Sequence, residues 1–326
     1  MTLEELHREG TARLRAGGAS ECGAPLAREA RALLLGAVGI SDLDYIRDPR
    51  RPVGRREEAR FLRSIGRRKT GTPLAYLTGS REFRSLSFAV GPGVFIPRPE
   101  TELLVELVLA KTGAAELSIL DLGTGSGCIA LALAAERPGA RITAADVSGR
   151  ALRTARRNAR RLGIGEGGGK RRPEREEWDG RRDSGGERCR MPVQERGDGS
   201  AGKVTFIRSD FFSAFAGGKQ GAPFDVIVSN PPYVSAGEWE ELEAGIRDFE
   251  PPEALVPGKT GLEALRHIIG ESPAHLKPGG RLVLEIGSGQ KDAVLSMFDG
   301  RWRDVACHAD LRGLPRAVTA RFLPKS

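Results

Sequence analysis

SILDLGTGSG, residues 118–127, joins a short apolar run to a glycine-rich loop, and the apolar segment 129–135 that follows is typical of a buried helix. Glycine has no Cβ, so such a loop can turn tightly and approach a ligand closely. Its spacing is GxGxG rather than GxGxxG, and the chain contains no GxxxxGK[ST] phosphate-binding loop. A loop of this kind after a strand predicts a ligand crevice at the carboxyl edge of an open α/β sheet.

Strand and helix signals alternate on the C-terminal side of this loop. Apolar runs and helical spacing predict strands near 141–145, 204–207, 225–228 and 281–285, and helices over 149–162, over 261–276 and around 293–295. Such alternation is typical of a mainly parallel sheet that is covered by helices on both faces. The sequence therefore predicts an α/β fold for this part of the chain.

The chain divides into regions of different character. Residues 1–75 have apolar side chains near helical spacing, which predicts a small helical domain. Residues 76–97 contain an alternating strand pattern and a Gly-Pro-Gly turn, which predict a β-hairpin linker to a larger domain at 98–326. Within that domain, residues 165–203 hold ten glycines and ten basic against nine acidic residues, so we expect a disordered surface insertion there.

The composition argues against several classes of protein. Four cysteines without a CxxC pair and four histidines without an HExxH pattern give no framework for a metal, so we expect no metal site. No stretch approaches the roughly 18 apolar residues of a membrane span, and the N-terminus lacks a signal-peptide pattern, so we expect a cytoplasmic protein. Residues 1–90 hold 17 Lys/Arg against 11 Asp/Glu. That excess fits either a solvated surface or a docking face for an acidic partner, whether nucleic acid or protein.

A second motif, Asn230-Pro231-Pro232-Tyr233, follows the apolar run 224–228. Asn supplies an acceptor and a donor on one short side chain. The two prolines restrict the backbone and remove two N–H donors, which holds the local carbonyl groups rigidly. Tyr supplies a flat face for stacking. Together these residues can hold a planar –NH2 group by its two hydrogens and leave its nitrogen facing a second reactant.

Asp146 ends the strand after the glycine loop, 25 residues beyond Asp121. A carboxylate at this place can accept hydrogen bonds from both hydroxyls of a ribose. Together with the loop spacing, this fits a nucleoside cofactor without a phosphate. The string 121–127 followed by Asp146 resembles the S-adenosylmethionine loop of Rossmann-like methyltransferases. That resemblance implies S-adenosyl-L-methionine as the cofactor and a closing antiparallel hairpin, with residues 316–322 as its last strand.

Further strings resemble one family along nearly the whole chain except the 165–203 insertion. They are YLTG at 76–79, REF at 81–83, FIPRPETE at 95–102, the loop at 121–127, NPPY at 230–233, LEIG at 284–287 with Gln290, and DLRG at 310–313. In this order they resemble the release factor glutamine methyltransferases, the PrmC/HemK family. NPPY alone is shared with N6-adenine methyltransferases and with ribosomal-protein glutamine methyltransferases, whereas IPRPETE favours the release factor branch.

The resemblance implies methyl transfer to the side-chain N5 of the glutamine in the Gly-Gly-Gln loop of peptide chain release factors. It also implies a Rossmann-like methyltransferase sheet and a helical substrate-docking domain at 1–75. By similarity, the cofactor-binding residues are Gly123, Thr124, Gly125, Ser126, Gly127, Asp146, Phe211 and Asn230. The same similarity assigns catalysis to Asn230, Pro231 and Tyr233, and substrate binding to these residues together with Pro232. Phe211 matches a position where the family often has an aromatic residue against the adenine.

The chemistry of an amide acceptor favours orientation over a strong base. An amide nitrogen is a poor nucleophile because its lone pair is delocalised into the carbonyl group, but it is uncharged and the sulfonium methyl donor is already activated. The Asn230 side-chain oxygen and the Pro231 carbonyl oxygen are expected to accept the two N–H hydrogens, with Tyr233 stacked on the amide plane. No histidine lies near these motifs in the sequence, which favours positioning over general-base catalysis.

Other functions fit parts of the pattern. An N6-adenine methyltransferase acting on DNA or RNA would meet the same planar amino group, but it needs a basic aromatic groove and a target-reading domain. A glutamine methyltransferase acting on a ribosomal protein fits the same four residues, whereas a non-enzymatic binding module leaves both motifs unexplained. Arg98, Glu100 and Glu102 fit either helix-start chemistry or a flap over the site. Glu285 fits either a structural role or a place in the substrate groove.

Overall fold

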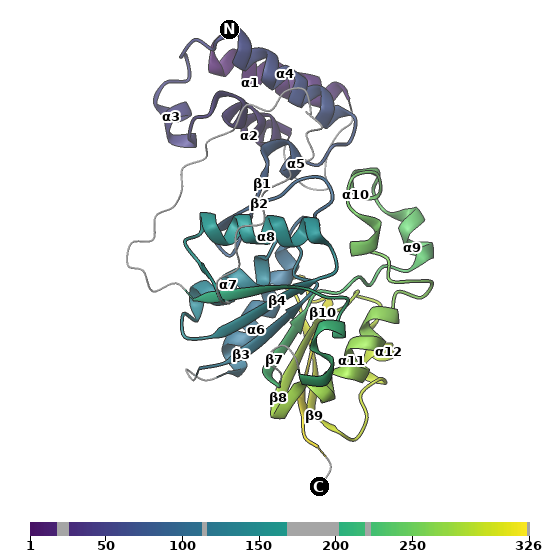
Figure 1. Ribbon diagram of the computed structural model, residues 1–326. Helices are drawn as coiled ribbons and strands as arrows, with labels where there is room; N and C mark the ends of the chain where they lie inside the picture. Colours follow the sequence, from purple (N-terminus) through teal and green to yellow (C-terminus); the bar gives the residue numbers. More distant parts are fainter. Residues whose placement is uncertain (18–25, 113–115, 168–201, 219–222, 325–326) are drawn as a thin grey trace. The chain divides into compact units, whose positions relative to one another are not determined.

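The computed structural model describes residues 1–17, 26–112, 116–167, 202–218 and 223–324. These residues form two compact units (Figure 1). The first comprises residues 1–79 together with Ala244–Phe249, and the second comprises the other described residues from Ser80 onward.

The first unit is built from helices, and the three longest of those described each bury one apolar face. Its elements are α1 (Leu3–Ala16), α2 (Leu26–Val38), α3 (Asp42–Arg47), α4 (Arg55–Lys69), α5 (Leu74–Thr78) and α10 (Ala244–Arg247). Its core contains Leu3, Leu6, Leu14, Ala30, Leu33, Leu34, Ala37, Phe61 and Ile65. Because these residues recur at intervals close to three or four within each helix, they lie on its inner face.

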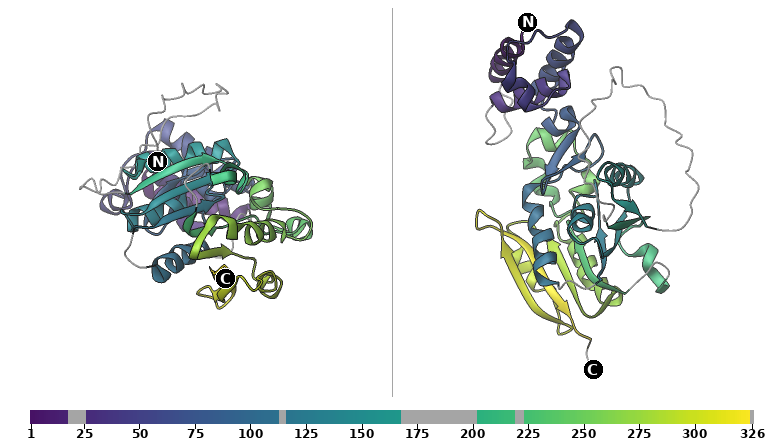
Figure 2. Two further views of the ribbon diagram at one scale, coloured as in Figure 1. Left: turned by 60° about the horizontal axis from the view of Figure 1, so that its bottom comes forward. Right: turned by 90° about the vertical axis from the view of Figure 1, so that its left-hand side faces the viewer.

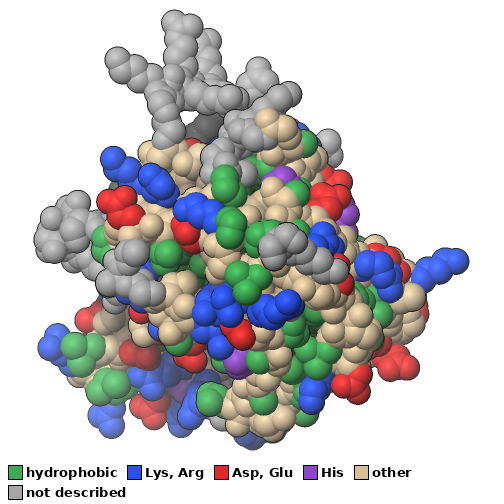
Figure 3. Space-filling model, turned by 90° about the horizontal axis from the view of Figure 1, so that it is seen from below, with side chains coloured by type: hydrophobic (Ala, Val, Ile, Leu, Met, Phe, Trp, Pro, Cys, Tyr) green, Lys and Arg blue, Asp and Glu red, His purple; other side chains and the backbone are tan. Residues whose placement is uncertain are grey.

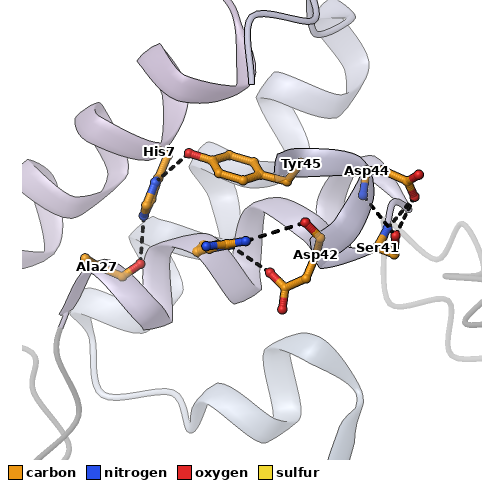
Figure 4. Close-up of polar contacts among 7 residues, drawn as sticks. His7, Ala27, Ser41, Asp42, Asp44 and Tyr45 are labelled. Carbon is orange, nitrogen blue, oxygen red and sulfur yellow. Dashed lines mark hydrogen bonds and ion pairs between the residues drawn. The ribbon is translucent and has the colours of Figure 1, made fainter. Parts of the chain in front are cut away.

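Polar contacts fix the packing of the helices in this unit (Figure 4). The His7 imidazole hydrogen-bonds to the Tyr45 hydroxyl through Nδ1 at 3.0 Å and to the Ala27 carbonyl through Nε2 at 2.8 Å. Since a carbonyl oxygen only accepts, Nε2 carries the hydrogen. A buried ion pair between Arg68 Nε and Glu29 Oε2, 2.7 Å apart, joins α4 to α2.

A two-stranded hairpin opens the second unit. It consists of β1 (Ser80–Phe83) and β2 (Leu86–Ala89), which pair antiparallel. Arg84 and Ser85 form its two-residue turn, with φ angles of 47° and 59°. The predicted hairpin region starts at residue 76, but Leu74–Thr78 forms α5, which ends where Gly79 adopts a left-handed conformation at φ 75°.

An eight-stranded sheet forms the centre of the second unit (Figures 1 and 2). Its strands are β3 (Ser118–Leu122), β4 (Arg141–Asp146), β5 (Gly165–Glu166), β6 (Lys203–Arg208), β7 (Phe224–Ser229), β8 (Leu276–Glu285), β9 (Trp302–Ala309) and β10 (Pro315–Phe322). Their order across the sheet is β5-β6-β4-β3-β7-β8-β10-β9. The strands from β5 to β8 in this order run parallel, and β10 pairs antiparallel with both β8 and β9.

Helices cover both faces of this sheet. The first face carries α6 (Glu102–Lys111), α7 (Cys128–Glu136) and α8 (Gly149–Arg161), and the second carries α11 (Glu263–His275) and α12 (Lys291–Leu295). Successive residues of one strand point to opposite faces of the sheet. Ile119 of β3 belongs to the hydrophobic core on the first face, and Leu120 to the core on the second face. The predicted α/β fold, a Rossmann-like sheet with an N-terminal helical region, is confirmed.

Several elements differ in detail from the prediction. The helix expected from residue 261 begins at Glu263, and the strand expected from residue 281 begins at Leu276. Strand β9 is absent from the prediction because most of its residues are only partly buried, which weakens the alternating pattern. Four short elements complete the unit: η1 (Pro99–Thr101), η2 (Ser213–Gly218), α9 (Ala236–Glu241) and η3 (Pro252–Ala254).

The ends of the predicted insertion at 165–203 belong to the sheet. Gly165–Glu166 forms β5, and Lys203 begins β6, which pairs with it in parallel. Residues 168–201, which make up the rest of the insertion, lie outside the described residues. Within the described part of the chain, no helix is long and apolar enough to span a membrane.

Candidate active site

The two motifs meet where the strand order of the sheet reverses. From β3 the chain runs outward to β4 and β6, and it then returns to β7 on the other side of β3. Leu122 and Ser229 are register partners at the ends of β3 and β7, and Ser229 Oγ donates to the Leu122 carbonyl at 2.7 Å. Gly123 and Asn230 are therefore the first residues after two neighbouring parallel strands, and they lie at the same edge of the sheet. Such a switch point is where open α/β sheets bind ligands.

The glycine loop has a backbone that other residues would strain. Gly123, Gly125 and Gly127 have φ angles of 70°, 58° and 85°, in the left-handed region. A Cβ at Gly127 would also lie 3.1 Å from the Cβ of Ala155 in α8. The Thr124 amide donates to the Ala145 carbonyl at 3.0 Å, which ties the loop to the end of β4. The loop is thus a fixed surface rather than a free turn.

Asp121 supports this loop from within the core. Its Oδ2 accepts from Thr124 Oγ1 at 2.7 Å and from the Ala130 amide at 3.2 Å. Oδ1 is buried without a hydrogen-bond partner among the described residues. Burial raises the pKa of this carboxyl to about 7, although the bonds from Thr124 and Ala130 oppose the rise.

Asp146 holds the other side of the loop. Its Oδ2 accepts from the Gly125 amide and its Oδ1 from the Ser148 amide, each at 2.8 Å. Burial raises its pKa despite these two bonds. Each carboxyl oxygen has a second lone pair, so Asp146 can brace the loop and still accept hydrogen bonds from a ligand.

A cavity of about 450 Å³ opens between the two motifs. Of the residues assigned from the sequence, it is lined by Gly123, Thr124, Gly125, Ser126, Asp146, Phe211, Asn230, Pro231, Pro232 and Tyr233. Gly127 does not line the cavity; it occupies the N-cap position of α7. The assignment of Gly127 to cofactor binding stays a prediction.

Phe211 has a strained backbone conformation, and its ring lies close to another aromatic ring. Its φ angle is 41°, which is rare for a residue with a bulky side chain, and Ser209 Oγ donates to its carbonyl at 2.7 Å. The ring of His267 from α11 lies 5.0 Å from that of Phe211, and both residues line the cavity. The expectation that no histidine lies near the motifs is wrong in space, because α11 brings His267 to the site from 56 residues further along the sequence.

The loop after β7 is held at both ends by side chains from other motif strings, to which the sequence analysis assigned no contact with this loop. Asn230 Nδ2 donates to Thr101 Oγ1 at 3.1 Å, and the Tyr233 hydroxyl donates to Glu285 Oε1 at 3.1 Å. Gln290 Nε2 donates to the Tyr233 carbonyl at 2.8 Å. Burial and the neighbouring charge of Glu285 raise the pKa of Tyr233, so its hydroxyl keeps its proton.

An ion pair links two walls of the cavity. Arg98 Nη2 pairs with Glu250 Oε1, and Glu250 Oε2 accepts from the Ile96 amide at 3.1 Å. The cavity is lined on one side of this pair by Phe95 and Pro97, and on the other by residues 251 and 253–257. Arg98 thus joins the start of η1 to the segment before η3. The sequence pattern offered no partner for it, because Glu250 lies 152 residues away.

Comparison with known proteins identifies the family. The model of the PrmC N-terminal domain matches residues 5–79, and that of the methyltransferase small domain matches residues 86–168. A release factor glutamine methyltransferase of Nitratidesulfovibrio vulgaris is 36% identical over 98% of this chain and 95% of its own length. One of Burkholderia pseudomallei is 40% identical over 91% and 92%. The chain belongs to the release factor glutamine methyltransferase family.

Membership of this family confirms the resemblance carried by the motifs and makes the chain a methyltransferase. Use of S-adenosylmethionine is a property of the family. A methyltransferase from Pyrococcus furiosus has a similar structure, with a TM-score of 0.47 and 18% identity over 81% of this chain and 96% of that chain. Among the described residues, no group of three or more His, Cys, Asp or Glu side chains is placed to hold a metal ion.

Proposed function

We propose that this chain transfers a methyl group from S-adenosylmethionine to the side-chain N5 of the glutamine in the Gly-Gly-Gln loop of peptide chain release factors, in the cytoplasm. The observation that carries the proposal is the pairing of Leu122 with Ser229. It sets the glycine loop and the Asn230–Tyr233 motif side by side on one cavity, as a methyl transfer between two ligands requires. Relatives that match nearly the whole chain are named release factor glutamine methyltransferases.

The site fits S-adenosylmethionine in size and in chemistry. The cavity falls in the range of about 300–1,000 Å³ that is usual for small-molecule sites. A Cβ added at Gly123 or Gly125 would meet no protein atom closer than 3.8 Å, so the space beside these residues is open. We assign residues 123–126 to the methionine part, Asp146 to the ribose and Phe211 to the adenine. When bound, the cofactor supplies a methyl group on a positively charged sulfur.

Asn230 and Pro231 orient the acceptor amide in this proposal. Asn230 Nδ2 is committed to Thr101, so Oδ1 is the atom left to accept a hydrogen bond. The Pro231 carbonyl supplies the second acceptor, and Pro232 and Tyr233 complete the wall against which the glutamine lies. Holding both N–H hydrogens favours pyramidal nitrogen and frees its lone pair for attack. Positioning of this kind can lower a barrier by roughly 7–11 kcal/mol at its upper limit.

The proton released by methylation needs no strong base near the nitrogen. It leaves after the new bond forms, when the nitrogen is strongly acidic, and solvent can accept it. Tyr233 is not assigned this role, because burial and the charge of Glu285 raise its pKa and its hydroxyl already donates to that residue.

The helical unit is assigned to docking of the release factor. Arg55, Arg56, Arg63, Arg67 and Lys69 of α4 are exposed, which supports contact with an acidic protein surface. On the face drawn in Figure 3, Lys and Arg side chains of the described residues lie among Asp and Glu side chains and form no continuous basic surface. On this face, the mixed charges provide no basic surface for a nucleic acid.

Transfer of a radioactive methyl group tests the proposal. The purified protein is incubated with methyl-labelled S-adenosylmethionine and, in parallel, with a release factor, the same factor with its Gly-Gly-Gln glutamine replaced by alanine, ribosomal proteins, rRNA and DNA. We expect label on the unmodified release factor alone. Label on DNA or rRNA, with none on the release factor, would support an adenine methyltransferase instead, and label on a ribosomal protein would support the third alternative.

A further inference from the structure

Helix α11 places two histidines against aromatic rings of the segment after β6, but only one of them reaches the cavity. The His275 ring stacks on that of Phe212, with centroids 4.5 Å apart and planes inclined by 1°. The His267 ring lies 5.0 Å from that of Phe211, with planes inclined by 51°. His267 and Phe211 line the cavity, whereas His275 and Phe212 do not. The mechanism above gives His267 no role.

The two histidines also differ in burial. His275 is 9% exposed and lies against Phe212, which belongs to the hydrophobic core on the second face of the sheet. The His267 side chain is 42% exposed, and Phe211 is only half-buried. Aromatic surface that stays exposed beside a cavity can pack against a flat ligand. His275 is therefore a core residue, whereas His267 has ring surface left for a ligand.

A short turn after β6 fixes the position of the Phe211 ring. Ser209 is 4% exposed, and its hydroxyl donates to the Phe211 carbonyl at 2.7 Å and accepts from the Ala214 amide at 3.0 Å. These bonds hold Phe211 at a φ angle of 41°. Backbone strain of this kind clusters at active sites and ligand sites. The turn thus holds the ring at the cavity, and His267 lies against it from a different element.

The distance between the two rings decides how a base can meet them. Aromatic rings in direct contact have centroids about 4.5–7 Å apart. At 5.0 Å, the rings of Phe211 and His267 touch each other and leave no room for a third ring between them. Because their planes are inclined, they form two adjoining walls of a corner. A flat base that packs on Phe211 in this corner also contacts His267.

We propose that His267 is a further cofactor-binding residue, whose imidazole ring forms with Phe211 the corner that holds the adenine of S-adenosylmethionine. This role rests on the proposed function, because it takes Phe211 as the residue against the adenine. Asp146, which is assigned to the ribose, lines the same cavity. His267 lies outside the motif strings, and only the packing of α11 on the sheet brings it to the site.

Binding of S-adenosylhomocysteine, measured by isothermal titration calorimetry, tests this role without turnover. His267→Ala is expected to weaken binding by about 3- to 10-fold, because the adenine loses one of its two aromatic walls. His267→Phe keeps a ring and should bind within about 2-fold of wild type. Unchanged affinity in His267→Ala, or equal losses in the two variants, would contradict the role.

Adenosine locates the contact within the cofactor. It has the adenine and ribose of S-adenosylhomocysteine but lacks the amino-acid part. His267→Ala should therefore weaken the binding of adenosine and of S-adenosylhomocysteine by the same factor. A loss for S-adenosylhomocysteine with none for adenosine would place His267 beside the amino-acid part, and the adenine corner would be wrong.

His275→Ala is the matched control, since it is the same substitution in the same helix. Its ring stacks on Phe212 in the core, so this variant should melt at a lower temperature and keep its affinity for S-adenosylhomocysteine within about 2-fold at a temperature well below melting. His267→Ala should show the reverse, because its side chain is partly exposed. If His267→Ala loses affinity only together with a lowered melting temperature, His267 is a structural residue and the role is wrong.

Methylation assays separate this role from the function on which it rests. With a release factor as acceptor, His267→Ala should raise KM for S-adenosylmethionine by about the factor lost in binding and keep kcat within about 2-fold. If wild type labels the release factor and His267→Ala binds S-adenosylhomocysteine as wild type does, the role of His267 is wrong and the proposed function stands. If His267→Ala weakens binding but wild type labels no release factor, the proposed acceptor is wrong and the adenine corner stands. A wild-type protein that binds no S-adenosylhomocysteine overturns both.

Discussion

The position of Asn230 in the cavity follows from the register of β3 and β7. Leu122 and Ser229 end neighbouring parallel strands, so the first residue of each following loop lies at the same edge of the sheet. The Ser229 hydroxyl bonded to the Leu122 carbonyl holds that edge together. A small shift of β7 would move Asn230 away from the glycine loop, so the sheet itself sets the distance between the two ligands.

Substitution of the two described asparagines should affect different properties, namely turnover for Asn230 and stability for Asn158. Asn230→Ala is expected to lower kcat by about 100-fold, because the acceptor amide loses its orientation, with a smaller loss of cofactor affinity and little change in melting temperature. Asn158 instead bonds the Ala89 amide at 2.7 Å and the Ala89 and Ser126 carbonyls at 3.0 and 2.9 Å in the core. Asn158→Ala should therefore destabilise the fold by about 1–3 kcal/mol. Methylation kinetics and thermal melts of both variants check this, and unchanged turnover in Asn230→Ala would remove its assigned role.

Asp121 should make stability depend on pH. Burial raises its pKa from 3.8 to about 7, so the folded state binds this proton more tightly than the unfolded state does. Stability contributed by that proton is present below about pH 4 and is lost as the pH rises through about 7. Asp121→Asn cannot ionise, so its free energy of unfolding relative to wild type should increase over this pH window. Urea denaturation at several pH values measures this difference in the free energy of unfolding between Asp121→Asn and wild type. A difference that does not change with pH would contradict the raised pKa.

For single residues, the sequence predicts a position within a strand, helix or loop, but not a contact with a residue far along the chain. Asn230 and Gly123 each follow an apolar run, so their positions at strand ends could be predicted. Thr101 lies 129 residues before Asn230, and nothing around it suggests that its hydroxyl would leave its own helix. His267 reaches Phe211 only through the packing of α11 on the sheet. Contacts of this kind depend on the order of the strands, which no local pattern contains.

Among the elements, the β1–β2 hairpin has a turn that can be improved. Ser85 has a φ angle of 59°, which costs a residue other than glycine about 1–2 kcal/mol. Ser85→Gly should raise the free energy of unfolding by about 0.5–1 kcal/mol, after the greater flexibility of glycine in the unfolded chain is counted. Ser87→Gly is the matched control: Ser87 lies in β2 opposite Glu82, so glycine there should lower stability by about 0.5–1 kcal/mol. Urea denaturation of the two variants should give shifts of opposite sign.

The elements that sequence patterns missed share a physical cause. Strand β9 is only partly buried along most of its length, so its side chains carry little alternation. Helix α5 covers five residues, too few for a helical period to emerge. Helices α7 and α8 were predicted nearly to their ends, because one is buried on all sides and the other has a continuous apolar stripe. Thus burial, rather than helix or strand propensity, decides which elements can be predicted from the sequence.

For the whole molecule, the strand order is what combines two short motifs into one site. The chain leaves β3 on one side and returns as β7 on the other, which opens a crevice between them. In the sequence, residues 168–201 stand between β5 and β6, the two strands at one edge of the sheet. The cavity is lined by residues that follow β3, β4, β6 and β7. We therefore expect the site to depend on these strand ends and not on the composition of this segment.

Replacing residues 168–201 by a linker of about six Gly and Ser residues should preserve methylation to within about 2-fold. The linker can span its ends, because the Gly167 amide bonds the Val204 carbonyl at 3.0 Å. Shortening the connection should also raise the free energy of unfolding by roughly 1–1.5 kcal/mol, since each halving of a flexible loop recovers about 0.6 kcal/mol of closure entropy. A second variant, with a Gly/Ser linker of the original length, separates composition from length. Loss of methylation in both variants, with their melting temperatures retained, would mean that the native segment acts in the reaction or in docking.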